Sequence, residues 1–88
     1  MIKDIDFQIG RVLETLENQG LDDNTIVVFS SDNGFVWGEH GRGDKRAAYD
    51  ESIRVPLLIH DPRQTSPVNT SNAMALNIDV APTLLDAA

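Results

Sequence analysis

A continuous run of apolar residues that ends in a polar turn constrains the fold more than any other feature of this sequence. Thr25-Ile26-Val27-Val28-Phe29-Ser30 is rich in β-branched side chains and shows no alternation with polar residues. Such a run predicts a β-strand that is buried on both faces, as in a parallel sheet covered by helices. A second run, Arg54 to His60, has the same character, and Pro56 is expected at its start because proline cannot donate to an interior ladder.

Helical patterns flank the two predicted strands. Apolar residues recur at spacings of three and four from Ile2 to Leu16, which predicts an amphipathic helix that ends at Gly20. Short helices are expected within residues 44–52 and after Asn77-Ile78-Asp79, and an exposed loop over residues 63–72. This order predicts an α/β fold with helices on both faces of the sheet. Two doubly buried strands need further neighbours, so we expect residues 1–88 to form part of a larger sheet.

The composition excludes several kinds of partner and site. The 88 residues carry a formal net charge of −7, which argues against nucleic acid or an anionic membrane surface as a partner. The absence of cysteine excludes disulfides and thiolate metal sites within these residues. No apolar run approaches the ~18 residues of a membrane span. Sheet edges left uncovered also predict self-association of the isolated chain.

Asp32, Asn33 and Gly34 follow the first predicted strand directly. Ligands gather beyond the carboxyl ends of strands in open parallel sheets, and carboxylate and amide oxygens suit calcium or magnesium. Gly34 is expected to let the backbone turn sharply there. The same residues also fit a hairpin turn between Phe29 and Phe35, so local sequence leaves both interpretations open.

Further polar residues follow in a glycine-rich stretch. Gly38-Glu39-His40-Gly41 places an imidazole in a loop, and Lys45-Arg46 adds two cations. Taken singly, a loop histidine and a pair of cations are most often solvated surface. Their order after Asp32-Asn33-Gly34, ahead of Tyr49 and the second predicted strand, is what favours a functional site.

This order resembles the sulfatase family. The matching stretches are "TIVVFSSDNG", "GEHG", "DKRAAYDESIRVPLLI" and "NIDVAPTLLDAA", and the first predicted helix is also similar to the helix that precedes this strand in sulfatases. The resemblance covers nearly the whole chain. The pairing of "DNG" with "DKR" and a following tyrosine resembles the glucosamine-6-sulfatase and mucin-desulfating branch.

The resemblance implies a fold related to alkaline phosphatase, a bound calcium and hydrolysis of a sulfate ester. It implies that Asp32 and Asn33 are metal ligands and that Lys45 contacts the sulfate. It places His40 near the substrate as a catalytic candidate, and gives Arg46 no counterpart. The expected partner is a sulfated small molecule or glycan, and the resemblance implies a periplasmic, extracellular or lysosomal parent protein.

The family's formylglycine nucleophile is made from a cysteine or serine in a Cys/Ser-x-Pro-x-Arg motif, which these residues lack. We therefore expect residues 1–88 to be the C-terminal part of a sulfatase catalytic domain, inactive alone. Two alternatives stay open at this point. One is a fragment of a related phosphoryl or phosphonate ester hydrolase, and the other is a small acidic module without catalysis.

Overall fold

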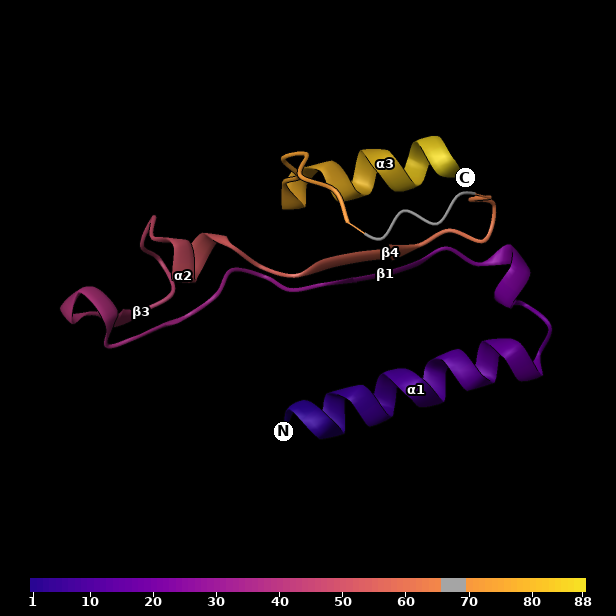
Figure 1. The fold of residues 1–88 in the computed structure, drawn as a ribbon, viewed down its shortest axis with the longest axis horizontal. Helices are drawn as coiled ribbons and strands as arrows, with labels where there is room; N and C mark the ends of the chain where they lie inside the picture. Colours follow the sequence, from indigo (N-terminus) through magenta and orange to yellow (C-terminus); the bar gives the residue numbers. More distant parts are fainter. Residues whose placement is uncertain (66–69) are drawn as a thin grey trace. The chain divides into compact units, whose positions relative to one another are not determined.

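A computed structural model describes residues 1–65 and 70–88 of the chain (Figure 1). The described residues divide into two compact units, residues 1–31 with 56–65 and residues 32–55 with 70–88. Together they form a small mixed α/β structure. The predicted loop over residues 63–72 includes residues 66–69, which lie outside the described part. The helices and strands are α1 (Ile2–Asn18), β1 (Val27–Ser30), β2 (Val36–Trp37), β3 (Gly43–Asp44), α2 (Asp50–Ile53), β4 (Leu57–His60) and α3 (Val80–Ala87).

The end of helix α1 follows from one glycine. Gly20 adopts the left-handed conformation, with φ of +64°. The Leu21 N–H donates to the Leu16 carbonyl at 3.0 Å, and the Gly20 N–H donates to the Glu17 carbonyl at 2.9 Å. These two bonds form a Schellman motif, which satisfies carbonyls that the last helical turn leaves open. The predicted helix and its end at Gly20 are therefore confirmed.

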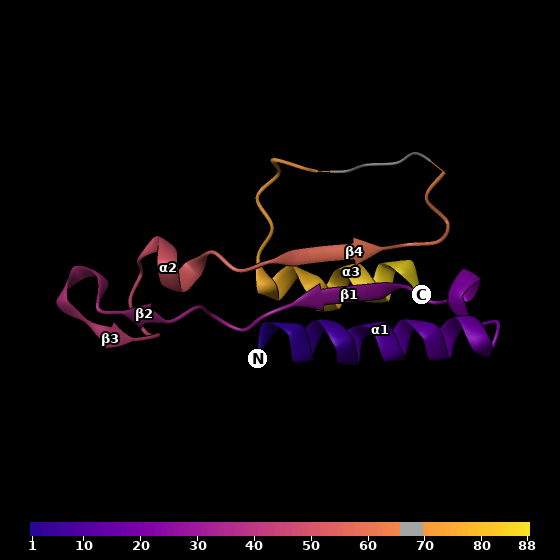
Figure 2. The same ribbon diagram turned by 60° about the horizontal axis from the view of Figure 1, so that its bottom comes forward.

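Strand β1 lies beside β4 in the first unit (Figures 1 and 2). The strands are antiparallel, with Val27 opposite His60 and Ser30 opposite Leu57. The prediction of a parallel strand is therefore wrong for the one pairing that β1 makes among the described residues. An apolar run is typical of strands that are covered on both faces, and it carries no information on the direction of the neighbouring strand. The second strand begins directly after Pro56, as predicted.

The hairpin alternative for Asp32-Asn33-Gly34 is also wrong. Phe29 pairs with Leu58 of β4, whereas β2 pairs with β3 in the second unit. The short helix expected within residues 44–52 is α2, which begins at Asp50. At the start of α3, the Asp79 carboxylate accepts a hydrogen bond from the Leu76 N–H at 2.8 Å. It thereby caps the 3₁₀ turn Asn77–Asp79 that leads into this helix.

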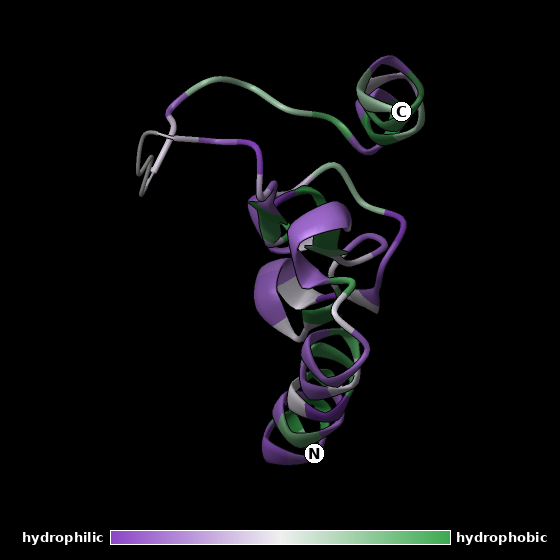
Figure 3. Cartoon of the chain, turned by 90° about the vertical axis from the view of Figure 1, so that its right-hand side faces the viewer, coloured by the Kyte–Doolittle hydropathy of each residue, from purple (hydrophilic) through white to green (hydrophobic). Residues whose placement is uncertain are grey.

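Little of the apolar surface is buried within the described residues. Among them, only Val36 and Ser52 are buried. The strand β4, predicted to be buried, is exposed along its whole length, and β1 is mostly half-buried. Helix α1 carries both hydrophobic and hydrophilic residues around its turns (Figure 3). Within residues 1–65 and 70–88, no helix combines the length and apolar character needed to cross a membrane.

Candidate metal and sulfate site

Gly34 fixes the segment after β1 against the helix α2. Its N–H donates to the Ser52 carbonyl at 2.8 Å. A Cβ at position 34 would collide with the Glu51 carbonyl oxygen, which is backbone and cannot move aside as a side chain could. The backbone of Gly34 does not have a positive φ, so the expected sharp turn is not the reason for glycine here. The close approach of two backbones is the reason.

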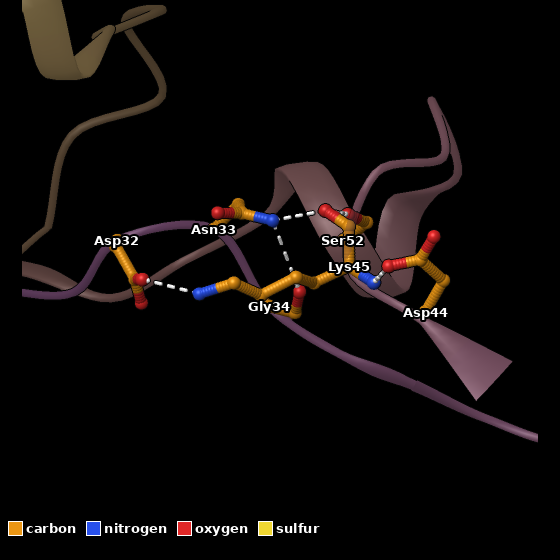
Figure 4. A network of polar contacts seen from close by, with 6 residues as sticks. All are labelled: Asp32, Asn33, Gly34, Asp44, Lys45 and Ser52. Atoms are coloured by element: carbon orange, nitrogen blue, oxygen red, sulfur yellow. Dashed lines mark hydrogen bonds and ion pairs between the residues drawn. The ribbon is translucent and has the colours of Figure 1, made fainter.

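Asn33 ties the same segment to the loop that carries Lys45 (Figure 4). The Asn33 amide Nδ2 donates to the Lys45 carbonyl, and the Ser52 hydroxyl donates to that carbonyl at 2.9 Å. The Lys45 carbonyl oxygen thus accepts hydrogen bonds from two side chains, Asn33 on the segment after β1 and Ser52 in helix α2. In Figure 4 the Asn33 amide oxygen points away from the Lys45 carbonyl. That oxygen is the donor atom that a hard cation would use.

Lys45 meets Asp32 through its ammonium group. The Nζ atom lies 2.7 Å from Oδ2 of Asp32, although the two residues are 13 positions apart. The side chains are 47% and 72% exposed. An ion pair this exposed contributes about 0–1 kcal/mol to stability, because water screens both charges. The pair therefore brings a carboxylate and a cation together in a site that solvent can reach.

His40 is held by two contacts from the start of α2. Its ring stacks on Tyr49, with 3.9 Å between the ring centroids and 11° between the planes. Its Nε2 lies 3.3 Å from Oε2 of Glu51. His40 has a φ of +56°, a left-handed conformation that costs a non-glycine residue about 1–2 kcal/mol. These contacts help to hold the residue in that conformation.

The Glu51 carboxylate is stabilised in its charged form. A hydrogen bond from its own backbone holds the pKa of Glu51 below its usual range, and the hydrogen bond with His40 acts in the same direction. The partial desolvation of the carboxylate opposes this shift of the pKa. At neutral pH the Glu51 carboxylate therefore only accepts hydrogen bonds, so the ring nitrogen of His40 that faces it must carry the hydrogen.

Asp32, Asn33 and Lys45, three of the four predicted site residues, form one network, whereas the contacts of His40 run to Tyr49 and Glu51. The contacts of Glu51 and Ser52 were not predicted from the sequence. The text "YDES" was part of the matching pattern, but it carries no sign that the Ser52 hydroxyl reaches Lys45 or that Glu51 reaches back to His40.

The donor chemistry of Asp32 and Asn33 fits a hard cation such as calcium, because both side chains offer oxygen. The two residues do not complete a site. Within residues 1–65 and 70–88, no group of three or more His, Cys, Asp or Glu side chains is placed to hold a metal ion. Calcium takes 6–8 oxygens, as a rule, so further ligands would have to come from water or from other residues.

Comparison with known proteins relates the chain to one enzyme family. The family model "Sulfatase" matches residues 1–88. The chain is 50% identical over 82 residues to an N-acetylglucosamine-6-O-sulfatase of Bacteroides thetaiotaomicron, covering 93% of this chain and 15% of that protein. It is 38% identical over 85 residues to the human N-acetylglucosamine-6-sulfatase, covering 96% of this chain and 15% of that protein.

A solved structure shares the fold of the chain. It is the structure of BT4656 in complex with its substrate D-glucosamine-2-N,6-O-disulfate, with a TM-score of 0.85 and 48% identity. The match covers 97% of this chain and 17% of that chain. Residues 1–88 thus span about one sixth of the length of these relatives. The family model covers the chain from its first residue to its last, and the chain belongs to the sulfatase family.

Proposed function

We propose that residues 1–88 supply part of the metal and sulfate site of a sulfuric ester hydrolase. In this proposal the chain is the C-terminal part of a sulfatase catalytic domain, and the longer enzyme that contains it is called the parent enzyme below. The parent would extend the strands β1 and β4 into a larger sheet covered by helices on both faces. The observation that supports the proposal most directly is the contact between Lys45 and Asp32, next to Asn33.

Asp32 and Asn33 would hold calcium through their side-chain oxygens. When bound, calcium would stabilise negative charge that develops on the oxygens of the sulfate ester. Asp32 would contribute the negative charge of the ligand pair, and Asn33 a neutral oxygen. The hydrogen bond from the Asn33 amide nitrogen to the Lys45 carbonyl would hold the amide oxygen on the opposite side of the group. The remaining oxygens would come from the parent enzyme and from water.

Lys45 would contact a sulfate oxygen. As a point charge with three rotatable donors, an ammonium can bind an anionic oxygen without a fixed fork geometry. Its pairing with Asp32 is weak enough for Lys45 to share its hydrogens with a bound sulfate. Negative charge on the sulfate group and the leaving oxygen grows as the ester bond breaks. Lys45 would therefore stabilise the transition state more than the ground state.

The substrate would be a sulfated glycan, in view of the relatives that act on N-acetylglucosamine 6-sulfate groups by name and of the BT4656 complex with a disulfated glucosamine. The nucleophile would come from the parent enzyme, because these 88 residues contain no cysteine and no Cys/Ser-x-Pro-x-Arg motif. The isolated chain would thus bind calcium weakly and would not hydrolyse sulfate esters.

An assay of aryl sulfate hydrolysis with added calcium tests this proposal. The parent enzyme is expected to turn over the ester and the 88-residue chain is not. Lys45→Ala in the parent should lower kcat by about 10²-fold to 10³-fold, as the loss of one electrostatic donor typically does. Lys3→Ala, which removes the same charge from the exposed start of α1, is the matched control and should keep its activity. Turnover by the isolated chain, or full activity of Lys45→Ala, would refute the proposal.

A further inference from the structure

The contacts of His40 determine which of its two ring nitrogens can meet another molecule. Nε2 faces Oε2 of Glu51 at 3.3 Å, and the face of the ring is covered by Tyr49 at 3.9 Å between centroids. Nδ1 has no hydrogen-bond partner within the part of the chain that the structure describes. The His40 and Glu51 side chains are 42% and 38% exposed, so both are partly open to solvent.

The chemistry of the pair fixes the tautomer of the imidazole. An ionised carboxylate can only accept hydrogen bonds, so Nε2 must carry a hydrogen to bond with Glu51. In a neutral imidazole the other nitrogen then has no hydrogen and presents a lone pair. Without Glu51, the hydrogen would be free to move to Nδ1, and the ring would be free to turn over. The Tyr49 stack restrains the plane of the ring but does not distinguish its two nitrogens.

We propose that Glu51 is a positioning residue for His40, which holds the Nε2–H tautomer so that Nδ1 accepts a hydrogen bond from a hydroxyl group of the sulfated substrate. This inference rests on the proposed function, since it assumes that the substrate binds beside the loop Gly38–Gly41. It adds a recognition role for the part of the substrate that is not the sulfate. Glu51 itself would not touch the substrate.

The stereochemistry of the loop supports this assignment. Gly38, His40 and Gly41 have φ values of +122°, +56° and +65°, so a side chain stands where the backbone favours glycine. The turn is closed by hydrogen bonds from the Gly41 N–H to the Gly38 carbonyl and from the Arg42 N–H to the Glu39 carbonyl, both at 3.1 Å. A strained residue whose ring has one edge and one face held by partners is typical of a group kept in place for contact with a ligand.

Kinetics of the parent enzyme on two substrates test the inference. The first substrate is a 6-O-sulfated glucosamine, which carries hydroxyl groups next to the ester, and the second is an aryl sulfate, which carries none. Glu51→Ala is expected to lower kcat/KM for the sugar by about 10-fold to 100-fold, as loss of the partners that orient imidazole metal ligands does. It should leave kcat/KM for the aryl sulfate unchanged. Glu51→Gln should stay within about threefold of the parent, because the amide oxygen still accepts from Nε2.

A double-mutant cycle separates positioning from a purely structural effect. If Glu51 acts through His40, Glu51→Ala should have no further effect on sugar hydrolysis in a His40→Ala background. Additive losses, or equal losses on both substrates, would overturn the inference. Asp50→Ala is the matched control, because that neighbouring carboxylate is 75% exposed and pairs with Arg54. Lys45→Ala should lower the activity on both substrates, and its failure to do so would count against the proposed function and not against the His40–Glu51 pairing.

Discussion

The backbone of Gly34 lies against the backbone of Glu51 so closely that position 34 has no room for a Cβ. The Gly34 N–H also donates to the Ser52 carbonyl at 2.8 Å. This contact joins the segment with Asp32 and Asn33 to the helix whose first residues hold His40. The segment with Asp32 and Asn33 and the residues that hold His40 therefore depend on the same close contact at Gly34.

Replacement of Gly34 by alanine should destabilise the second unit. The added methyl group would push apart two backbones, and overpacking of this kind costs about 1–3 kcal/mol. Val36 lies in β2 and is fully buried, so the NMR signal of its methyl groups during urea denaturation reports on this unit. We expect a lower unfolding midpoint for Gly34→Ala.

Gly10→Ala is the matched control for this change. A Cβ at position 10 of helix α1 would meet nothing within 4 Å. Because alanine is the better helix former, this variant should be neutral or more stable by about 0.5–1 kcal/mol. An unfolding midpoint of Gly34→Ala equal to that of the unmodified chain would contradict the close approach.

The turn after β4 has a pH-dependent ion pair. Arg63 donates to Asp61 from Nε and from its terminal nitrogen, both at 2.9 Å, and from its backbone N–H at 3.0 Å. The side-chain hydrogen bonds of Arg63 hold the pKa of Asp61 below its ordinary value of 3.8, and the backbone bond adds to the shift. Because the pKa is lowered on folding, the stabilisation is present above pH 3.8 and is lost as the pH falls through the lowered pKa.

Titration of the Asp61 carboxyl carbon by NMR measures this shift directly. Arg63→Ala should raise the pKa of Asp61 toward 3.8, because the charge and all side-chain donors are removed. Arg11→Ala removes the same charge from α1, where Arg11 bonds to Gln8, and should leave the pKa of Asp61 unchanged. An Asp61 pKa that is the same in Arg63→Ala as in the unmodified chain would show that the pair does not form.

The isolated 88-residue chain should self-associate or be only marginally stable. Large apolar side chains of the first unit are widely exposed, including Phe7 at 64% and Leu58 at 59%. Surfaces of this kind associate with one another when no other part of a protein covers them. Sedimentation velocity over a range of concentrations is expected to show oligomers or a weakly cooperative thermal transition. A monodisperse monomer that melts cooperatively above about 65 °C would contradict this expectation.

Much of the secondary structure could be predicted because local patterns determine it. The apolar spacing of α1 and the conformational freedom of Gly20 locate that helix and its end. The apolar runs locate β1 and β4, and Pro56 marks where β4 begins. The direction of their pairing could not be predicted in this way, since it depends on the path of the chain between Ser30 and Leu57. Strand β4 was also predicted to be buried, whereas it is exposed among the described residues.

The candidate site could be predicted only where the chemistry of a side chain identifies its role. Asp32, Asn33 and Lys45 stand out as oxygen donors and a cation in a recognisable order, and the structure brings them together. The hydrogen bonds that hold these side chains in place use backbone atoms, such as the carbonyls of Lys45 and Ser52, and every residue type possesses such atoms. Its geometry could not be predicted because no sequence pattern records which carbonyl a distant side chain will reach.

The calcium content and activity of an Asp32→Ala variant of the parent enzyme test the central claim most directly. The purified variant would be equilibrated with calcium, measured by atomic spectroscopy and assayed on an aryl sulfate, beside an Asp23→Ala control in the exposed 3₁₀ turn after α1. We predict that Asp32→Ala loses both the bound calcium and the activity, because the charged ligand is gone, and that Asp23→Ala keeps both. An Asp32→Ala enzyme with normal calcium content and normal turnover would contradict the assignment of Asp32 to the metal site.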